Sequence, residues 1–137
     1  MTSSSSPLRT AGAALGILAG ALGLLAVVVG ALGAHAGLST ASSAWIETGL
    51  KYHLPHLAVA WAAVIAAPAA PPKARRDLLL AAALWSFGIL AFAGGLYVQA
   101  LSDLRPGIIV PAGAFGLIGG WIFAALAAVR LSRGAAA

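Results

Sequence analysis

The sequence contains no cysteine, which excludes a disulfide framework and a thiolate metal site. Charge is also scarce: 8% of the 137 residues are charged, whereas 61% are hydrophobic. Soluble domains carry roughly 25% charged residues, because a fold in water needs a polar surface. So few charged side chains cannot cover such a surface. We therefore expect the lipid bilayer to surround this chain, which is long enough for one domain.

Motifs of the common enzyme classes are missing as well. The sequence has no HExxH motif, no Walker loop and no convincing dinucleotide fingerprint. No Ser–His–Asp or paired-carboxylate arrangement can be drawn, which argues against hydrolysis. The net charge of +5 does not indicate nucleic-acid binding, because the basic residues form short clusters and no basic face interleaved with aromatics. We expect neither an enzyme nor a nucleic-acid partner.

Four apolar runs dominate the chain, at residues 11–34, 49–67, 78–101 and 108–131. A helix needs about 20 apolar residues to cross a bilayer, and lipid requires that its backbone groups pair internally. The second run is shorter and carries Lys51, His53 and His56, so it spans only if these residues lie at the interface. The pattern predicts an all-α integral membrane four-helix bundle, formed by a single domain over residues 11–131.

Short tails flank this predicted domain. Residues 1–10 and 132–137 are expected to be cytoplasmic tails, the first of them disordered because it is rich in serine. The first apolar run resembles a signal peptide with a cleavage site at "AHA" (34–36). However, signal sequences have only about 7–15 apolar residues. We expect this run to remain in the protein as a transmembrane helix.

The basic residues predict the orientation. With four spans, both termini share one side of the membrane with six basic residues: Arg9, Lys73, Arg75, Arg76, Arg130 and Arg133. The other side holds two basic and two acidic residues: Lys51, Arg105, Glu47 and Asp103. Cytoplasmic loops carry an excess of lysine and arginine. We therefore expect a multi-pass protein of the bacterial cytoplasmic (inner) membrane with both termini in the cytoplasm.

A short interfacial helix is expected before the second span. Ser42 or Ser43 would be its N-cap, and Trp45 would anchor it in the outer interface. Pro55 would lie near the join with the span and permit a bend.

Small residues recur four apart on two spans, a spacing that lets helix backbones approach closely in lipid. The predicted helix-packing residues are Gly12, Gly16 and Gly20 in the first span and Gly116 and Gly120 in the fourth. In a chain rich in glycine and alanine, such spacing also arises from composition alone. The pattern does not say whether the partner is another helix of the chain or a second copy.

The motif "YHLPH" (52–56) places two of the three histidines three residues apart, on one face of a helix. In the predicted topology His35, His53 and His56 all lie at the outer end of the bundle. Imidazole is a common ligand of transition metals and haem, so a metal or haem site on these histidines is one hypothesis. The other polar residues expected in this cluster are Glu47, Tyr52, Tyr97 and Gln99.

Two other hypotheses explain the same histidines. In a membrane, polar side chains also link helices through hydrogen bonds. A transport pathway is the third hypothesis, but no charged residue lies in the middle of any span, where transporters usually keep one. We favour helix bridging and expect no cofactor, with a metal or haem module and a small transporter as the alternatives.

Four segments carry a family resemblance, in this order: "GALGAHAGL" (30–38), "YHLPHLA" (52–58), "GGLYVQAL" (94–101) and "VPAGAFGLIGGW" (110–121). Together they resemble the domain of unknown function 423 family, the YgdD-like small membrane proteins of bacteria, which have relatives in eukaryotes. The resemblance covers about residues 11–128. It implies four transmembrane helices, a plasma-membrane location and no established reaction.

The sequence departs from the family pattern near the expected polar cluster. Ala36 stands where the family usually has glycine, and Gly95 stands where serine is common. Val110 and Ala114 replace parts of a Thr-Pro-x-Gly-Gly pattern around Pro111. These replacements remove hydroxyl groups and weaken any hydrogen-bonded site that would depend on them.

These patterns together predict a small, non-enzymatic component of the membrane. Its partners would be the lipid bilayer and either further copies of itself, as a homo-oligomer, or a larger membrane complex. In that case the histidines would hold the outer ends of the first three helices together.

Overall fold

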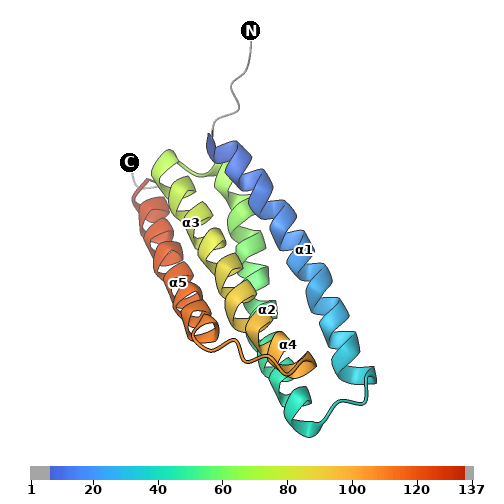
Figure 1. The fold of residues 1–137 in the computed structure, drawn as a ribbon. Helices are drawn as coiled ribbons and strands as arrows, with labels where there is room; N and C mark the ends of the chain where they lie inside the picture. The colour runs from blue at the N-terminus through green and yellow to red at the C-terminus, as the bar shows by residue number, and fades with distance from the viewer. Residues whose placement is uncertain (1–6, 135–137) are drawn as a thin grey trace.

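The computed structural model describes residues 7–134, and this part of the chain contains helices and no strands (Figure 1). The elements are α1 (Pro7–His35), α2 (Thr40–Ala66), the 3-10 turn η1 (Ala67–Ala69), α3 (Pro72–Gly88), the π-helical turn η2 (Ile89–Ala93), α4 (Gly94–Leu101) and α5 (Ile109–Gly134). Because α3, η2 and α4 follow one another without a break, they form one long helix. The predicted all-α fold class is confirmed.

Three of these helices are long and apolar enough to cross a membrane: Pro7–His35, Pro72–Leu101 and Ile109–Arg133. Helix α2 has a similar length, 27 residues, but it is not among them. The cause is its composition, since Lys51, His53 and His56 lie within it. The polar side chains of α2 therefore determine whether this helix can lie in lipid.

Helix α2 and the long helix α3–η2–α4 occupy the middle of the bundle (Figure 1). Helix α1 packs against α2 and α3 on one side, and α5 packs along α3 and η2 on the other. The start of α1, the α2–α3 connection and the end of α5 lie at one end of the bundle (Figure 1). The α1–α2 and α4–α5 connections lie at the opposite end.

The positive charge gathers at the first of these ends, which we call the basic end. It holds six basic residues and one acidic residue: Arg9, Lys73, Arg75, Arg76, Arg130, Arg133 and Asp77. Toward the opposite end the charges balance, with two of each sign: Lys51, Arg105, Glu47 and Asp103. The whole charge excess of +5 therefore belongs to one end of the molecule.

The helices extend beyond the predicted spans. Helix α1 begins at Pro7, so residues 7–10 are helical and do not belong to a disordered tail. Proline is favourable at the first helical position, where its missing N–H would have no partner. Helix α3 begins at Pro72 for the same reason, and α5 continues to Gly134. Residues 1–6 and 135–137 of the predicted tails lie outside the described residues.

Helix α2 differs most from the prediction. It is one continuous helix from Thr40 through Pro55 to Ala66, so within residues 7–134 no separate short helix precedes this run. Its N-cap is Ser39 and not Ser42 or Ser43: the Ser39 side chain accepts a hydrogen bond from the Ser42 backbone N–H at 3.2 Å.

The turn before α2 explains this early start. Gly37 has a φ of +60°, a conformation that glycine adopts at no steric cost. The chain therefore reverses within residues 36–39, and the helix starts at once. Pro55 removes one backbone hydrogen bond of α2 but does not end it. Gly107, with a φ of +53°, allows the reversal between α4 and α5.

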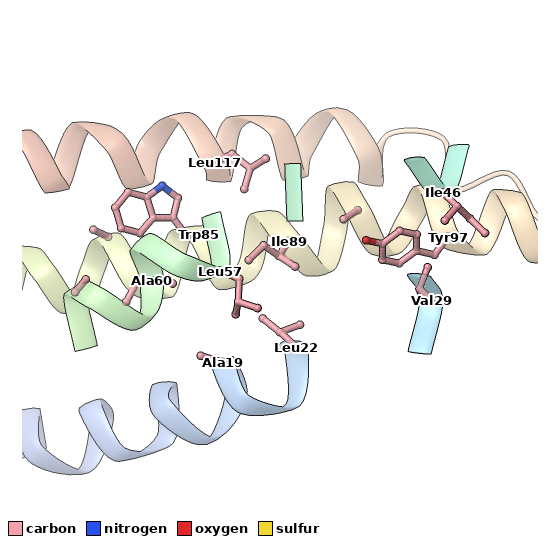
Figure 2. Packing of buried hydrophobic residues seen from close by; sticks show 14 of the residues in the cluster. Ala19, Leu22, Val29, Ile46, Leu57, Ala60, Trp85, Ile89, Tyr97 and Leu117 are labelled. Carbon is pink, nitrogen blue, oxygen red and sulfur yellow. The ribbon is translucent and has the colours of Figure 1, made fainter. Parts of the chain in front are cut away.

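Alanine is the most frequent of the buried hydrophobic residues within residues 7–134, and larger side chains lie among them between the helices (Figure 2). Trp85 of α3 is the largest fully buried side chain. Leu22 of α1, Leu57 of α2 and Ile89 of η2 belong to the same cluster. Because most of the core side chains are small, the helix backbones can lie close together, as is typical of helices packed in lipid.

The tightest contacts lie between α5 and the neighbouring α3 and η2. Three glycines of α5 leave no room there for a side chain: Gly113, Gly116 and Gly120. A Cβ at Gly113 would lie 2.8 Å from the backbone carbon of Ala91, and a Cβ at Gly116 would lie 2.7 Å from Phe87 Cδ1. A Cβ at Gly120 would overlap the indole of Trp85.

The three predicted packing glycines of α1 have more space around them. Added Cβ atoms at Gly12 and Gly16 would each lie 3.7 Å from the nearest side chain, and one at Gly20 would lie 3.9 Å away. These are ordinary van der Waals distances. Of the predicted packing glycines, those of α5 are therefore required by a close approach, and those of α1 are not.

We expect Gly113→Ala to destabilise the protein by about 1–3 kcal/mol, because the new methyl group meets the backbone of η2, which cannot rotate away. The control is Gly20→Ala on α1, where the methyl group fits and alanine favours the helix. Denaturant titration of both variants in detergent measures the change in unfolding free energy. Equal effects at the two positions would contradict this description of the packing.

Candidate functional site: polar side chains that join the helices

His53 of α2 is completely buried, with 0% of its surface exposed. Its Nδ1 lies 3.0 Å from the hydroxyl oxygen of Tyr97 on α4, which is also buried. Gly49, one turn before His53, lies directly against the Tyr97 ring, and a Cβ there would overlap it. The absence of a side chain at Gly49 thus lets the tyrosine reach His53 and join α4 to α2.

The other ring nitrogen of His53, Nε2, is buried and makes no hydrogen bond to the residues that the structure describes. The hydrogen bond of the His53 ring to another side chain is thus the one to Tyr97. A tyrosine hydroxyl both donates and accepts, so this pair forms with either tautomer of the neutral ring.

His56 is joined to α5. Its Nε2 lies 3.1 Å from the indole Nε1 of Trp121, and its Nδ1 lies 2.7 Å from the backbone carbonyl oxygen of Tyr52, one turn earlier. The indole N–H can only donate and the carbonyl oxygen can only accept. His56 must then accept at Nε2 and donate from Nδ1. The two bonds together define a neutral imidazole with its proton on Nδ1.

Aromatic contacts extend the hydrogen-bonded group of His56, Tyr52 and Trp121. Trp121 packs edge-on against His56 and against Trp85, with ring centroids 6.0 Å and 5.2 Å apart. Tyr52 packs edge-on against Phe92 of η2, at 5.0 Å. Edge-to-face pairs of this kind stabilise packing beyond the area they bury. The result is a polar and aromatic layer that connects α2 to α3, η2 and α5.

An open groove of about 400 Å³ lies beside this layer, on the outside of the bundle, and its walls include Tyr52, His56 and Trp121. Both nitrogen atoms of His56 are already hydrogen bonded. The groove therefore offers no free imidazole nitrogen to a ligand or a metal ion.

The three histidines have three different surroundings. His53 contacts α4, His56 contacts α5, and His35 is exposed at the end of α1. Within residues 7–134 no group of three or more His, Cys, Asp or Glu side chains is placed to hold a metal ion. The geometry thus supports links between helices and gives no support to a shared ligand site.

The predicted polar cluster is only partly brought together. Tyr97 joins His53 through its hydroxyl, and Tyr52 joins His56 through its backbone. Gln99 lines a separate hollow of about 220 Å³ at the end of the bundle opposite the basic end. Glu47 is exposed on α2.

Two residues of the interhelix contacts were not predicted from the sequence: Trp121 and Asp77. Asp77 is buried at the basic end, where its Oδ2 lies 3.0 Å from Nε of Arg130 on α5. It is one of only three acidic residues and stands directly after a basic cluster, which was the available signal. No such signal existed for Trp121, because its partner depends on how α5 lies beside α2.

Residues 29–116 match the family described as a protein of unknown function (DUF423). The chain is 33% identical over 106 residues to the UPF0382 inner membrane protein YgdD of Escherichia coli (strain K12), and the match covers 74% of this chain and 78% of that protein. The protein of the same name from Shigella flexneri matches to the same extent. No solved structure matches.

We expect His56 to be protonated on Nδ1 and unprotonated on Nε2, as its two hydrogen bonds require. Solid-state ¹⁵N NMR of histidine-labelled protein in bilayers distinguishes the two nitrogens, and the signals lost in His56→Gln assign them. Trp121→Phe should shift the Nε2 signal. The control Trp61→Phe, on the same helix as His56, should leave this signal in place. A proton on Nε2 in the unaltered protein would contradict the assigned geometry.

Proposed function

The chain belongs to the DUF423 family, and on this basis we propose that it is a non-enzymatic, multi-pass component of the bacterial inner membrane. Its role is structural or accessory: the bundle itself, and not a bound cofactor, is the functional unit. The proposal is supported by the curated relative, which is named as an inner membrane protein. It requires no nucleic-acid partner.

One observation carries the non-enzymatic part of the proposal. Both nitrogen atoms of His56 are used in bonds within the protein, and His53 is buried against Tyr97. A catalytic or ligand-binding histidine needs an accessible nitrogen. The two histidines of "YHLPH" instead stabilise the contacts of α2 with α4 and α5.

In this proposal α2 also crosses the membrane, in addition to the three apolar helices, and is the second of four spans along the chain. Its length of 27 residues is sufficient, and its two histidines have hydrogen-bond partners on other helices, which lowers the cost of placing them in lipid. Its first turns, with Trp45, Glu47 and Lys51, would lie at the outer interface, where such side chains are favourable. The fold is then a single four-span domain.

The charge distribution supports an orientation with both termini in the cytoplasm. The basic end holds six basic residues, and such an excess of lysine and arginine is typical of cytoplasmic loops. The opposite end, with balanced charges, would face the outside.

The bilayer is the proposed surrounding of the outer face. Large apolar side chains such as Ile17, Ile108 and Phe115 are exposed by 77%, 80% and 75%. In water this exposure would be unfavourable, whereas lipid chains are as apolar as these side chains. A homo-oligomer or a larger membrane complex would cover part of the same face.

The test compares His53→Gln, His56→Gln and His35→Gln in purified protein. We expect the first two to lower the unfolding free energy by about 1 kcal/mol each, because each breaks a hydrogen bond between helices. The His35 variant is the matched control, since this residue is exposed at a helix end, and its stability should not change.

Elemental analysis and absorption spectra of the same samples provide the second readout. The proposal predicts that the unaltered protein and the variants have the same metal content and no absorption band of a cofactor. A near-stoichiometric metal or haem that is lost in His53→Gln or His56→Gln would overturn the proposal and favour a binding module.

A further inference from the structure

The basic end contains an open groove of about 510 Å³ between α1, the end of α2 and the start of α3. Its walls combine two kinds of surface. Gly12, Gly16 and Leu79 form an apolar part, and two basic side chains, Arg9 and Arg75, line the same groove. A groove that is apolar along its length and cationic at its mouth fits an amphiphilic ligand with a negative head.

Arg75 is held at the groove by the protein backbone. Its Nε donates to the Ala67 carbonyl at 3.0 Å, and one Nη donates to the Pro68 carbonyl at 2.8 Å. Positive side chains are favourable at the last carbonyl groups of a helix, and these bonds fix the guanidinium at the end of α2. The other Nη takes part in none of these bonds and remains available to a ligand.

The charges of Arg9 and Arg75 are not neutralised within the described structure. The one ion pair of residues 7–134 joins Arg130 to Asp77, and Asp77 is the only acidic residue at this end. Arg9 is exposed on the first turn of α1. Two arginines that share a groove without an acidic partner are suited to an anionic group such as a phosphate.

We propose that this groove binds one anionic phospholipid, with the phosphate at Arg9 and Arg75 and an acyl chain along Gly12 and Gly16. A free phosphate would leave the apolar part of the groove unfilled. A second copy of the chain would lie in the membrane with the same orientation, so its own basic end would face this one and repel it. A lipid alone matches both the charge and the apolar surface.

This inference rests on the membrane location in the proposed function, but it is tested separately from it. Lipid binding is measured in detergent and does not depend on the roles of His53 and His56. If the groove binds no lipid, the predicted effects of the histidine variants are unchanged. If the histidines instead bind a metal, the lipid result still stands.

The experiment is native mass spectrometry of the full-length protein in detergent, titrated with phosphatidylglycerol or phosphatidylethanolamine. We expect one tightly bound phosphatidylglycerol and weaker binding of the zwitterionic lipid. Arg9→Gln should weaken phosphatidylglycerol binding about fivefold, the effect of one basic residue near an anionic lipid. Arg76→Gln is the matched control. It removes the same charge from the same end but does not line the groove, so it should change binding less than twofold.

A second pair of variants tests the apolar part of the groove. Gly12→Leu fills it, whereas Gly20→Leu adds the same side chain to the same helix outside it. The first should abolish the tight lipid and the second should preserve it, with folding of both checked by circular dichroism. If Gly12→Leu does not fold, the comparison of Arg9→Gln with Arg76→Gln tests the proposal by itself.

Three results would overturn the proposal. Equal weakening by Arg9→Gln and Arg76→Gln would indicate diffuse attraction to the basic end and no defined site. Equal binding of the two lipids would exclude a role for the anionic head. A dimer that forms in place of the lipid-bound monomer would identify a second copy as the occupant.

Discussion

A histidine side chain inside a bilayer must find its hydrogen-bond partners within the protein, because lipid offers none. Among residues 7–134, α2 is the long helix that is not apolar enough to cross by composition, and in the proposed four-span fold it would bring two such side chains, His53 and His56, into the bilayer. Tyr97 and Trp121 supply the partners. These hydrogen bonds join α2 to α4 and, through the indole of Trp121, to α5, so that in the proposed four-span fold both histidines have partners within the protein.

Close packing makes these pairs geometrically accessible. Gly49 admits the ring of Tyr97, and Gly113 lets α5 approach the backbone of η2. Without these approaches the side chains of α4 and α5 would lie too far from α2 to reach it. At the basic end the ion pair between buried Asp77 and exposed Arg130 joins α5 to α3 a second time. Polar bonds and small residues thus act together, as expected where burial of apolar surface does not drive helix association.

The sequence predicted the helices better than their contacts. Hydropathy located the apolar runs because a spanning helix has a minimum length, and the motif "YHLPH" drew attention to two histidines whose side chains contact other helices. The sequence could not predict that His53 and His56 contact different helices, since spacing along one helix does not reveal its neighbours. Equal glycine spacing in α1 and α5 likewise concealed a difference in packing, because only the helices opposite them decide how much room remains. The continuity of α2 through Pro55 was missed because proline weakens a helix without always ending it.

The most direct test of this account asks whether α2 crosses the membrane. The chain has no cysteine of its own, so single cysteines at Ala36, before α2, and at Ala69, after it, report their positions without interference. Both residues are exposed. With a membrane-impermeant thiol reagent applied to intact cells, we predict that Ala36→Cys is labelled and that Ala69→Cys reacts only after the membrane is permeabilised. Labelling of both cysteines from the same side would show that α2 does not cross, and would contradict the account.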